Sequence, residues 1–216
     1  MDEVDPWLNP EWDRSALLVI DTQVDFVEGG ASPIAGTQEV VPTVASLLRA
    51  FRAAARPIVH VVRLYGGDDV DLSRRTLLAS GAPIVRPGTP GSQIVPSLPP
   101  PSAPPLAAEE LLAGGFQQLG AAEWAMWKPR WGAFYRTDLE GFLRRHAVST
   151  VVVAGCNFPN CPRATIVEAS ERDFRVVIAA DAISGVQPWH LEEAVRIGAV
   201  PATTDAIATK VGANAR

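Results

Sequence analysis

Four short, uninterrupted apolar runs constrain the fold of this chain more than any other feature. Each run is rich in β-branched residues and is bounded by polar or turn-forming residues. Because they lack the alternation of a half-exposed strand, such runs suit strands buried on both faces, as in a parallel sheet covered by helices. The runs cover residues 16–20, 58–64, 150–154 and 175–179.

Amphipathic stretches with helical spacing of their apolar residues lie between and after these runs. They cover residues 40–55, 138–146, 163–173 and 189–197. Strands that alternate with helices in this way predict a three-layer α/β/α fold around a parallel sheet. Because the chain has 216 residues, 47% of them hydrophobic, it can bury one substantial core, and we expect a single domain over residues 1–216.

Charge and hydropathy narrow the class of partner. Acidic residues outnumber basic ones by 24 to 19, so the chain lacks the positive excess with which proteins bind nucleic acid. No apolar run approaches the length of a membrane span, and the first residues are acidic where a secretory signal would be basic and then apolar. We therefore expect a cytoplasmic protein that acts on a small molecule, without nucleic acid or membrane partners.

Neither the cysteines nor the histidines form a recognisable framework. The two cysteines lie five residues apart, and in a cytoplasmic chain both would stay reduced. The three histidines are scattered, so no closely spaced set of zinc ligands is present. We expect no metal and no cofactor.

Residues 83–105 contain nine prolines and differ from the rest of the chain. Proline at this density prevents a regular helix or a central strand, so we expect an ordered loop over the surface. Long loops in compact domains are more often functional than idle. The alternative is a linker between two domains, but the strand pattern resumes downstream as if it completed the same sheet.

Asp21 follows the first apolar run directly. Ligands of parallel α/β sheets bind at the carboxyl ends of the strands, and partial burial there raises the pKa of a carboxylate and equips it for proton transfer. An aspartate in this position also commonly caps the next helix or turn. On its own, the position does not separate the two roles.

Cys161 lies in a segment that leads from the third apolar run into a helix. Gly155 permits an unusual backbone angle at the strand exit, and Pro162 fits the first turn of a helix. A cysteine at a helix N-terminus is stabilised as the thiolate, and the free N–H groups there can hold an oxyanion. The alternative is a small buried hydrophobe, which we keep for Cys156.

Lys128 lies between two tryptophans, Trp127 and Trp131, and is followed by Gly132 and Phe134. Such neighbours belong in a core or a pocket lining, so an ordinary solvated lysine is not expected. Its ammonium could stabilise an aspartate or a cysteine anion. A lysine whose stem is buried while its charge reaches solvent, or a structural salt bridge, is the alternative.

Together these segments resemble the isochorismatase-like cysteine hydrolases, a family that also contains nicotinamidases, N-carbamoylsarcosine amidases and related amidases. The resemblance runs from about Ala16 to about Thr204. It rests on several blocks in the right order, which are far more specific together than singly. The blocks are residues 16–26, 87–91, Lys128 with 132–134 and 137–139, 153–155 with Cys161, 164–165, 168–169 and 181–184.

The resemblance implies a six-stranded parallel sheet flanked by helices, with Asp21, Lys128 and Cys161 as a catalytic triad. It also implies an oxyanion hole made by the N–H groups of Asn157 and Cys161, helped by a cis peptide bond between Cys156 and Asn157. Members of the family are commonly oligomers that complete their pockets across subunit contacts. The resemblance therefore implies a homo-oligomer, a dimer or a tetramer, and leaves open whether a second subunit contributes to the pocket of this chain.

Two departures from the family pattern bear on the substrate. The nicotinamidase branch of the family is of a metal-binding type, with an aspartate and histidines after the second strand. In this chain His60 lies inside the predicted second strand instead. We therefore expect neither the metal nor nicotinamide. Phe158 and Pro162 replace a threonine and a valine that are usual in the family, and Phe158 should make its side of the pocket more apolar.

The predicted reaction is hydrolysis of a C–N amide-type bond through a thioester on Cys161. Cleavage of a vinyl ether, as in true isochorismatases, and an idle family member that serves in binding or assembly are the alternatives. For the substrate we expect polar contacts from Gln23 and Asn157. Candidate apolar walls, each of which could equally belong to the core, are Phe26, Trp131, Phe134, Phe158 and Trp189.

Overall fold

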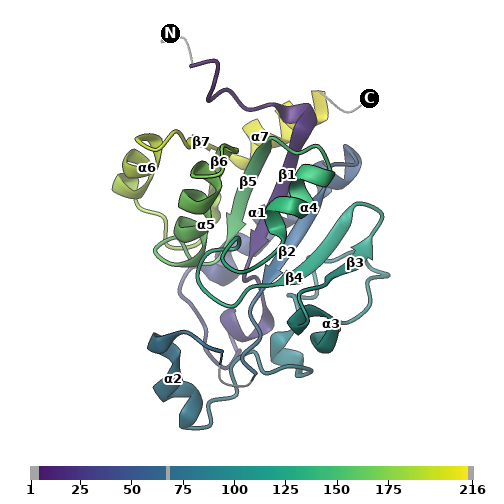
Figure 1. The fold of residues 1–216 in the computed structure, drawn as a ribbon, viewed down its shortest axis with the longest axis vertical. Helices are drawn as coiled ribbons and strands as arrows, with labels where there is room; N and C mark the ends of the chain where they lie inside the picture. The colour runs from purple at the N-terminus through teal and green to yellow at the C-terminus, as the bar shows by residue number, and fades with distance from the viewer. Residues whose placement is uncertain (1–4, 67–68, 214–216) are drawn as a thin grey trace.

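A single sheet of seven strands runs through the middle of the molecule, and helices lie on both of its faces (Figure 1). The computed structural model describes residues 5–66 and 69–213. The strand order is β3-β4-β2-β1-β5-β6-β7. The strands are β1 (Ser15–Ile20), β2 (Ile58–Val62), β3 (Phe116–Gly120), β4 (Glu123–Trp127), β5 (Thr150–Gly155), β6 (Arg175–Ile183) and β7 (Val200–Ala202).

The α/β class is confirmed, but the prediction of a six-stranded, wholly parallel sheet is wrong. Six strands, β4 to β7 in spatial order, are parallel, and β3 adds a seventh that runs antiparallel to β4 at the edge. The reason is the connection between them: β3 ends at Gly120 and β4 begins at Glu123. So short a turn joins antiparallel strands only.

Seven α-helices are present in the described residues. The four predicted ones all form, with ends that differ by up to three residues, and α5 begins two residues earlier than expected, at Cys161. The helices are α1 (Thr37–Ala53), α2 (Leu72–Ala79), α3 (Ala108–Leu112), α4 (Leu139–Arg145), α5 (Cys161–Ser170), α6 (Pro188–Val195) and α7 (Thr204–Ala213).

Side chains alternate between two cores, one on each face of the sheet. In β1, Leu17 and Val19 belong to the core beneath α1 and α7, whereas Leu18 and Ile20 belong to the core beneath α4 and α5. All six residues of β1 are buried because both faces of this strand are covered. The unbroken apolar run in the sequence therefore indicated a central strand.

The proline-rich segment is an ordered loop, with one short 3₁₀ helix at Pro90–Ser92. Leu98 within it is fully buried in the core beneath α1. Strands from before and after the loop pair in the same sheet, since β4 lies next to β2. The alternative of a linker between two separate sheets is therefore excluded.

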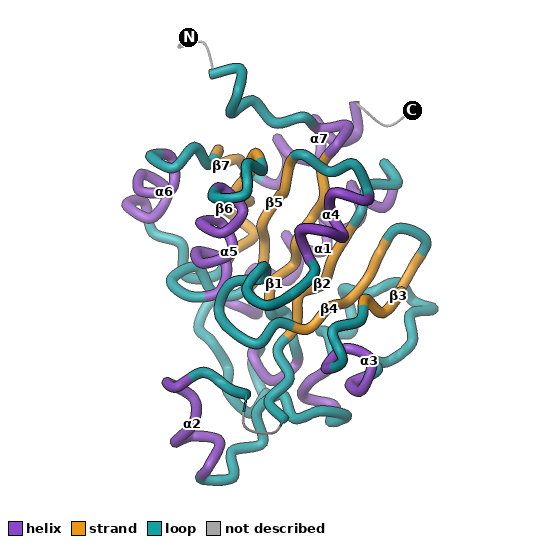
Figure 2. Tube along the Cα trace, viewed as in Figure 1, coloured by secondary structure: helices purple, strands orange, loops and turns teal. Residues whose placement is uncertain are grey.

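The order of the strands directs attention to β1. The chain passes from β1 to β2 on one side, and later from β4 to β5 on the other side of β1. Such a switch point opens a crevice at the carboxyl ends of the strands, where ligands of these folds bind. In Figure 2 the long loops and α2 gather at this end of the sheet.

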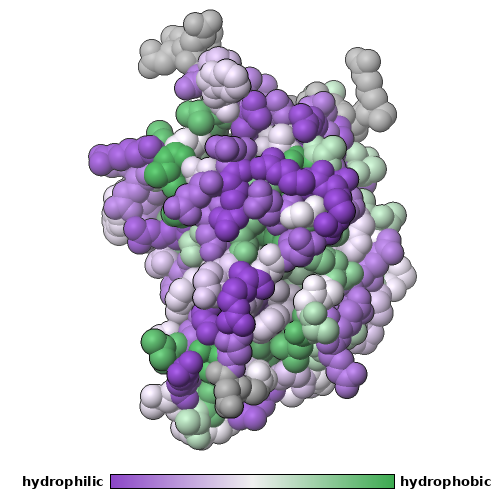
Figure 3. All heavy atoms as spheres, viewed as in Figure 1, coloured by the Kyte–Doolittle hydropathy of each residue, from purple (hydrophilic) through white to green (hydrophobic). Residues whose placement is uncertain are grey.

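The face of the molecule that carries α4 and α5 is mostly hydrophilic, with hydrophobic side chains showing in separate patches (Figure 3). Exposed apolar side chains include Leu72 and Leu77 on α2 and Val167 on α5. Within the described ranges, no helix is both long and apolar enough to cross a membrane.

Candidate active site

Four neighbouring strands bring polar residues to one edge of the sheet. Asp21 follows β1, Arg63 follows β2, Lys128 follows β4 and Cys156 follows β5. Because these strands are parallel and adjacent, their carboxyl ends meet there. Residues more than 130 positions apart in the sequence are thereby brought together.

Asp21 is buried and forms an ion pair with Lys128. Its backbone N–H donates to the carbonyl oxygen of Val61 at 2.9 Å, which continues the pairing of β1 with β2. Its φ of +50° lies in the left-handed region, which aspartate tolerates better than most residues. This angle ends the strand and turns the side chain to the rim, where Oδ2 accepts a hydrogen bond from Lys128 Nζ at 2.9 Å.

Lys128 is completely buried, which excludes a lysine whose charge reaches solvent. Its N–H donates to the carbonyl oxygen of Val62 at 3.1 Å, so its backbone extends the pairing of β4 with β2. Besides Asp21, the ammonium donates to the carbonyl oxygen of Arg130 at 3.3 Å. A buried ammonium with these partners holds the Asp21 carboxylate in one place.

The turn after β5 depends on Gly155. Its φ is +115°, and a Cβ atom there would lie 2.1 Å from the carbonyl oxygen of Ile20. This close approach allows the N–H of Cys156 to donate to the same oxygen at 2.8 Å. Only glycine permits both the angle and the contact.

The prediction of a cis peptide bond between Cys156 and Asn157 is wrong, because the described residues contain no cis peptide. For a residue other than proline, the trans form is favoured by about 3–4 kcal/mol. Here Gly155 supplies the sharp change of direction at the strand exit, so the following bond adopts the ordinary form.

Cys161 is the first residue of α5, and Pro162 follows as the second. As predicted, the proline occupies a position at which its missing N–H leaves no bond unmade. The backbone N–H groups of Asn157 and Cys161 donate to no acceptor among the described residues. The predicted oxyanion hole requires such free donors, and it stays a prediction.

The Cys161 thiol is not a resting thiolate. Burial raises its pKa, the negative charge of Asp21 raises it further, and together they outweigh Lys128 and Arg63, so the pKa reaches about 12. The expectation that the helix N-terminus makes Cys161 a thiolate is wrong. The reason is that Cys161 is only 5% exposed and lies beside a carboxylate.

The thiol and the Asp21 carboxylate line the same cavity, and the negative charge of Asp21 contributes to the raised pKa of Cys161. Asp21 Oδ1 is buried and has no hydrogen-bond partner among the described residues, so it can accept a proton. Catalytic hydrogen bonds often reach their short geometry only when a substrate is bound.

A small cavity of about 20 Å³ opens onto these groups. Five residues predicted for the site line it: Asp21, Phe26, Trp131, Asn157 and Cys161. Lys128 lies behind Asp21 and acts through it. The cavity is completed by Ile34, Arg63, Tyr65, Arg74, Cys156 and Asn160.

Gln23 does not line this cavity. Its side chain donates to the carbonyl oxygens of Arg63 and Ser92 and accepts from the N–H of Arg63, all at 2.7–2.8 Å. These bonds tie the loop after β2 and the proline-rich loop to the loop after β1. Gln23 therefore supports the walls of the cavity and has no free group for a substrate.

Phe134 is also part of the core. Its ring lies near that of Phe174, at 5.8 Å between centroids, and its N–H donates to Glu168 at 2.9 Å. Gly132 makes room for this contact, because a Cβ atom there would lie 2.1 Å from Glu168 Oε2. Residues 132–134 and Glu168, two blocks of the family resemblance, thus fasten the loop after β4 to α5.

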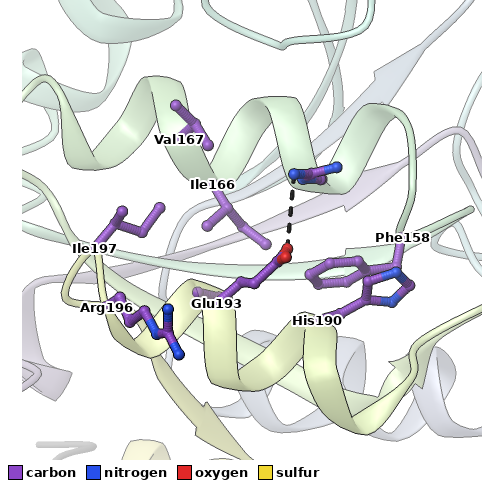
Figure 4. Close-up of a pocket in the computed structure, with 9 residues that line it drawn as sticks. Phe158, Ile166, Val167, His190, Glu193, Arg196 and Ile197 are labelled. Atoms are coloured by element: carbon purple, nitrogen blue, oxygen red, sulfur yellow. Dashed lines mark ion pairs between the residues drawn. The ribbon is translucent and has the colours of Figure 1, made fainter.

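Phe158 lines a different hollow, of about 320 Å³, between α5 and α6. Its ring is stacked on His190, with 4.8 Å between the centroids, and an ion pair between Arg163 and Glu193 crosses the same hollow (Figure 4). The expectation that Phe158 makes the wall beside Cys161 more apolar is therefore not met. Trp189, at 56% exposure, lines neither cavity.

Arg63 is a residue of the site that the sequence analysis missed. Its guanidinium is buried, forms an ion pair with Asp71 and lies over the rings of Tyr65 and Trp131, at 5.1 and 5.6 Å from their centroids. The signal was present, because Arg63 interrupts the second apolar run. We included it in the predicted strand, whereas β2 ends at Val62.

His60 has a structural partner within the sheet. As predicted it lies in β2, and its Nε2 is 2.7 Å from Glu123 Oε1 on β4. In the described ranges, no group of three or more His, Cys, Asp or Glu side chains is placed to hold a metal ion.

Comparisons with known proteins agree with this architecture. A relative from Arabidopsis thaliana, described as a probable inactive nicotinamidase, is 32% identical over 183 residues, or 82% of this chain and 84% of its own length. An isochorismatase family protein from Desulfovibrio vulgaris superposes with a TM-score of 0.75 at 32% identity, covering 90% of this chain and 96% of that one.

A nicotinamidase from Bacillus subtilis has a TM-score of 0.68 at 26% identity and covers 88% and 99% of the two chains. The family model of the isochorismatase domain matches residues 15–206. That range includes the whole sheet and every residue placed in the cavity. The chain belongs to the isochorismatase family.

Proposed function

We propose that this protein is a cysteine-dependent hydrolase of a small amide-type substrate, with Cys161 as nucleophile and Asp21 as general base. The observation that carries the proposal is the meeting of a thiol and a carboxylate in one cavity, whose lining also includes Asn157. Asp21 and Cys161 both line it, and the ion pair from Lys128 fixes Asp21. A nucleophile, an oriented base and an oxyanion site are the parts that acyl transfer requires.

In the first step, the thiol proton of Cys161 moves to Asp21 as the sulfur attacks the carbonyl carbon of the substrate. A new C–S bond forms, and the carbonyl π electrons move to oxygen. The resulting oxyanion lies within reach of the N–H groups of Asn157 and Cys161. Because the resting thiol has a pKa of about 12, the proton leaves during the attack and not before it.

In the second step, the protonated Asp21 gives its proton to the departing nitrogen as the C–N bond breaks. Cys161 is left as a thioester. Asp21 then accepts a proton from water as the water oxygen attacks the thioester carbon. When the C–S bond breaks and the acid is released, Asp21 returns this proton to the sulfur, which regenerates the thiol and the carboxylate. Lys128 keeps the carboxylate aligned during these transfers.

An amide suits this arrangement because its nitrogen is a poor leaving group until it is protonated. The proton that Asp21 takes from Cys161 is available to that nitrogen in the same cavity. Vinyl-ether cleavage does not require the thiol, so it leaves Cys161 beside Asp21 without a role. The nicotinamidase description of the Bacillus subtilis protein also supports the amide.

An idle member of the family is the second candidate, favoured by one observation, the description of the Arabidopsis relative as probably inactive. That name concerns nicotinamidase activity in the relative. In this chain Asp21 and Cys161 line one cavity and Lys128 is paired with Asp21, which supports a hydrolase over an idle member. A chain that served only in binding or assembly would have no need for a buried Lys128–Asp21 pair beside a cysteine.

A screen for ammonia or amine release from small amides, ureides and lactams tests the proposal, with pyruvate release from isochorismate measured in parallel. We expect turnover of at least one C–N substrate, and loss of that turnover in Cys161→Ser. Cys156→Ser is the matched control, because Cys156 is equally buried five residues away. Retention of full turnover in Cys161→Ser, or pyruvate release alone, would rule the proposal out.

A further inference from the structure

Arg74 is a lining residue of the cavity that the proposed chemistry does not use. It lies on α2, in the segment that follows Asp71, and lines the same cavity as Cys161 and Asp21. Its side chain is half-buried, so part of its charge is withdrawn from solvent. A half-buried cationic side chain that lines a cavity is expected to bind an anionic group.

The other charged groups of the cavity already have partners. Asp21 is paired with Lys128, and Arg63 is paired with Asp71. Arg74 forms no ion pair or side-chain hydrogen bond with any residue that the structure describes. Each pair is formally neutral, so among the described residues of the cavity Arg74 carries the one positive charge without a partner.

We infer that the substrate carries a carboxylate, bound by Arg74, at the end away from its scissile amide. This inference rests on the proposed function and names its substrate class, an amide of a small acid. A guanidinium presents two parallel N–H donors that match the two oxygens of a carboxylate. The bound substrate would complete the charge balance of the cavity, which the protein alone leaves open.

The two ends of the cavity have different tasks. The charges that act on the Cys161 thiol come from Asp21, Lys128 and Arg63, so the scissile carbonyl belongs at that end. Arg74 comes from α2, a helix with no buried residues that lies apart from the body of the sheet (Figure 1). A substrate held at both ends is positioned for attack, which is the usual benefit of a charged anchor remote from the reacting atoms.

Arg75 provides a matched control on the same helix. It is exposed, does not line the cavity and has no ion pair among the described residues. Replacing Arg74 or Arg75 by alanine changes the net charge and the helix propensity of α2 in the same way. Any difference between the two variants therefore reports the position of the guanidinium.

The first test uses malonamic, succinamic and glutaramic acids and the methyl ester of each, with ammonia release as the readout. The ester keeps the amide but removes the charge. For the best acid we expect wild-type kcat/KM at least about tenfold above that of its ester. Arg74→Ala should bring this ratio close to one, mainly through KM, Arg74→Lys should retain part of it, and Arg75→Ala should keep it.

A ratio that is the same in Arg74→Ala and in the wild type would overturn the inference. An equal loss of the acid-to-ester preference in Arg75→Ala would also overturn it, because a general effect of surface charge would then explain the preference. High salt should reduce the preference only in part, since a half-buried pair is screened less than an exposed one.

A second test does not depend on turnover. Iodoacetate and iodoacetamide alkylate the same sulfur but differ by one carboxylate, and peptide mapping separates Cys161 from Cys156. At Cys161, the rate of alkylation by iodoacetate divided by the rate with iodoacetamide should fall severalfold in Arg74→Ala. The same ratio should stay unchanged in Arg75→Ala. An iodoacetate-to-iodoacetamide ratio that is unchanged in both variants would contradict the inference. If this ratio falls in Arg74→Ala as expected but no amide is hydrolysed, only the proposed function would be contradicted.

Discussion

The charge state of Cys161 is decided by two neighbours and by burial. The free N–H groups at the start of α5 favour a thiolate, but the Asp21 carboxylate and the loss of water oppose it. Asp21, and not Cys161, therefore forms the ion pair with Lys128 in this site. The sulfur becomes nucleophilic only when a carbonyl group is present to receive it.

The pH dependence of alkylation tests this charge distribution. Because the pKa is near 12, the thiolate fraction of Cys161 should rise about tenfold per pH unit across the range from about pH 7 to pH 9. The iodoacetamide rate at Cys161, followed by mass spectrometry, should rise in proportion and show no plateau. A rate that is already constant in this range would mean that the thiolate exists in the resting protein.

Removal of the ammonium should disable the base. In Lys128→Met the Asp21 carboxylate loses the buried partner that holds it in place, so we expect kcat to fall about 100-fold. Stability should fall by about 3–5 kcal/mol, as for other buried pairs that lose one partner. The double variant Asp21→Asn with Lys128→Met should recover stability in urea unfolding but not activity, and an active Lys128→Met would exclude the assigned role.

At this scale the sequence indicated the residues whose position follows from the end of a buried strand. Asp21, Lys128 and Cys161 are such residues, and the structure brings them together. Gln23 was misjudged because its partners, such as Ser92, lie on a loop far away in the sequence. Arg63 was missed because a buried arginine in an apolar run does not reveal its partner Asp71.

The elements divide into those that hold the site and those that cover the sheet. β1, β2, β4 and β5 end at the site, and the turn after β5 sets the distance between the end of β5 and the start of α5. The sequence analysis did not predict β3, β4 or β7. Of these, β4 is the outermost of the four strands that end at the site, and β3 and β7 are the two edges of the sheet. β3 is an edge strand with polar residues, and β7 has only three residues and contains Pro201, which suits an edge position.

Gly155→Ala should damage both the fold and the site. The new Cβ atom would meet the Ile20 carbonyl, and the φ of +115° is unfavourable for alanine, so we expect a loss of about 3 kcal/mol in the free energy of unfolding. Gly29→Ala is the control, because Gly29 also has a positive φ but has no atom within 4 Å of its Cβ position. A cost at Gly155 no larger than that at Gly29 would contradict the close approach of β5 to β1.

Glu123 joins three elements at the other end of β4. It accepts hydrogen bonds from Arg52 of α1, at 2.7 Å to each oxygen, and contacts His60 of β2. Burial would raise its pKa, but the bonds from Arg52 and His60 outweigh burial and lower it. Glu123→Ala should therefore cost about 3 kcal/mol near neutral pH, since it leaves the buried His60 and the half-buried Arg52 without their carboxylate.

The pH dependence of that loss has a definite sign. Because folding lowers the Glu123 pKa below its ordinary value of 4.5, the stabilisation is complete above this pH and shrinks as the pH falls through the folded value. Urea unfolding of the wild type and Glu123→Ala should converge in acid. Asp138→Ala, which breaks the exposed pair with Arg145, is the control and should cost less than about 1 kcal/mol.

The whole molecule is organised around the crevice at the carboxyl ends of its parallel strands. The alternation of apolar runs and helices was sufficient to predict the α/β class, because each run lies in a strand covered on both faces. The path of the proline-rich loop could not be predicted, since it depends on bonds from Gln23 and on the contact of Gly91 with the Asp25 carboxylate. The single domain and the homo-oligomer stay predictions.

The central claim is that an acyl group passes through Cys161. Intact-protein mass spectrometry of an acid-quenched reaction with the best amide substrate tests it most directly, with peptide mapping to locate the adduct. The account predicts a mass increase equal to the acyl half of the substrate on Cys161, absent in Cys161→Ser and unchanged in Cys156→Ser. Single-turnover product release from the wild type with no adduct at any quench time, or an adduct on Cys156 instead, would contradict it.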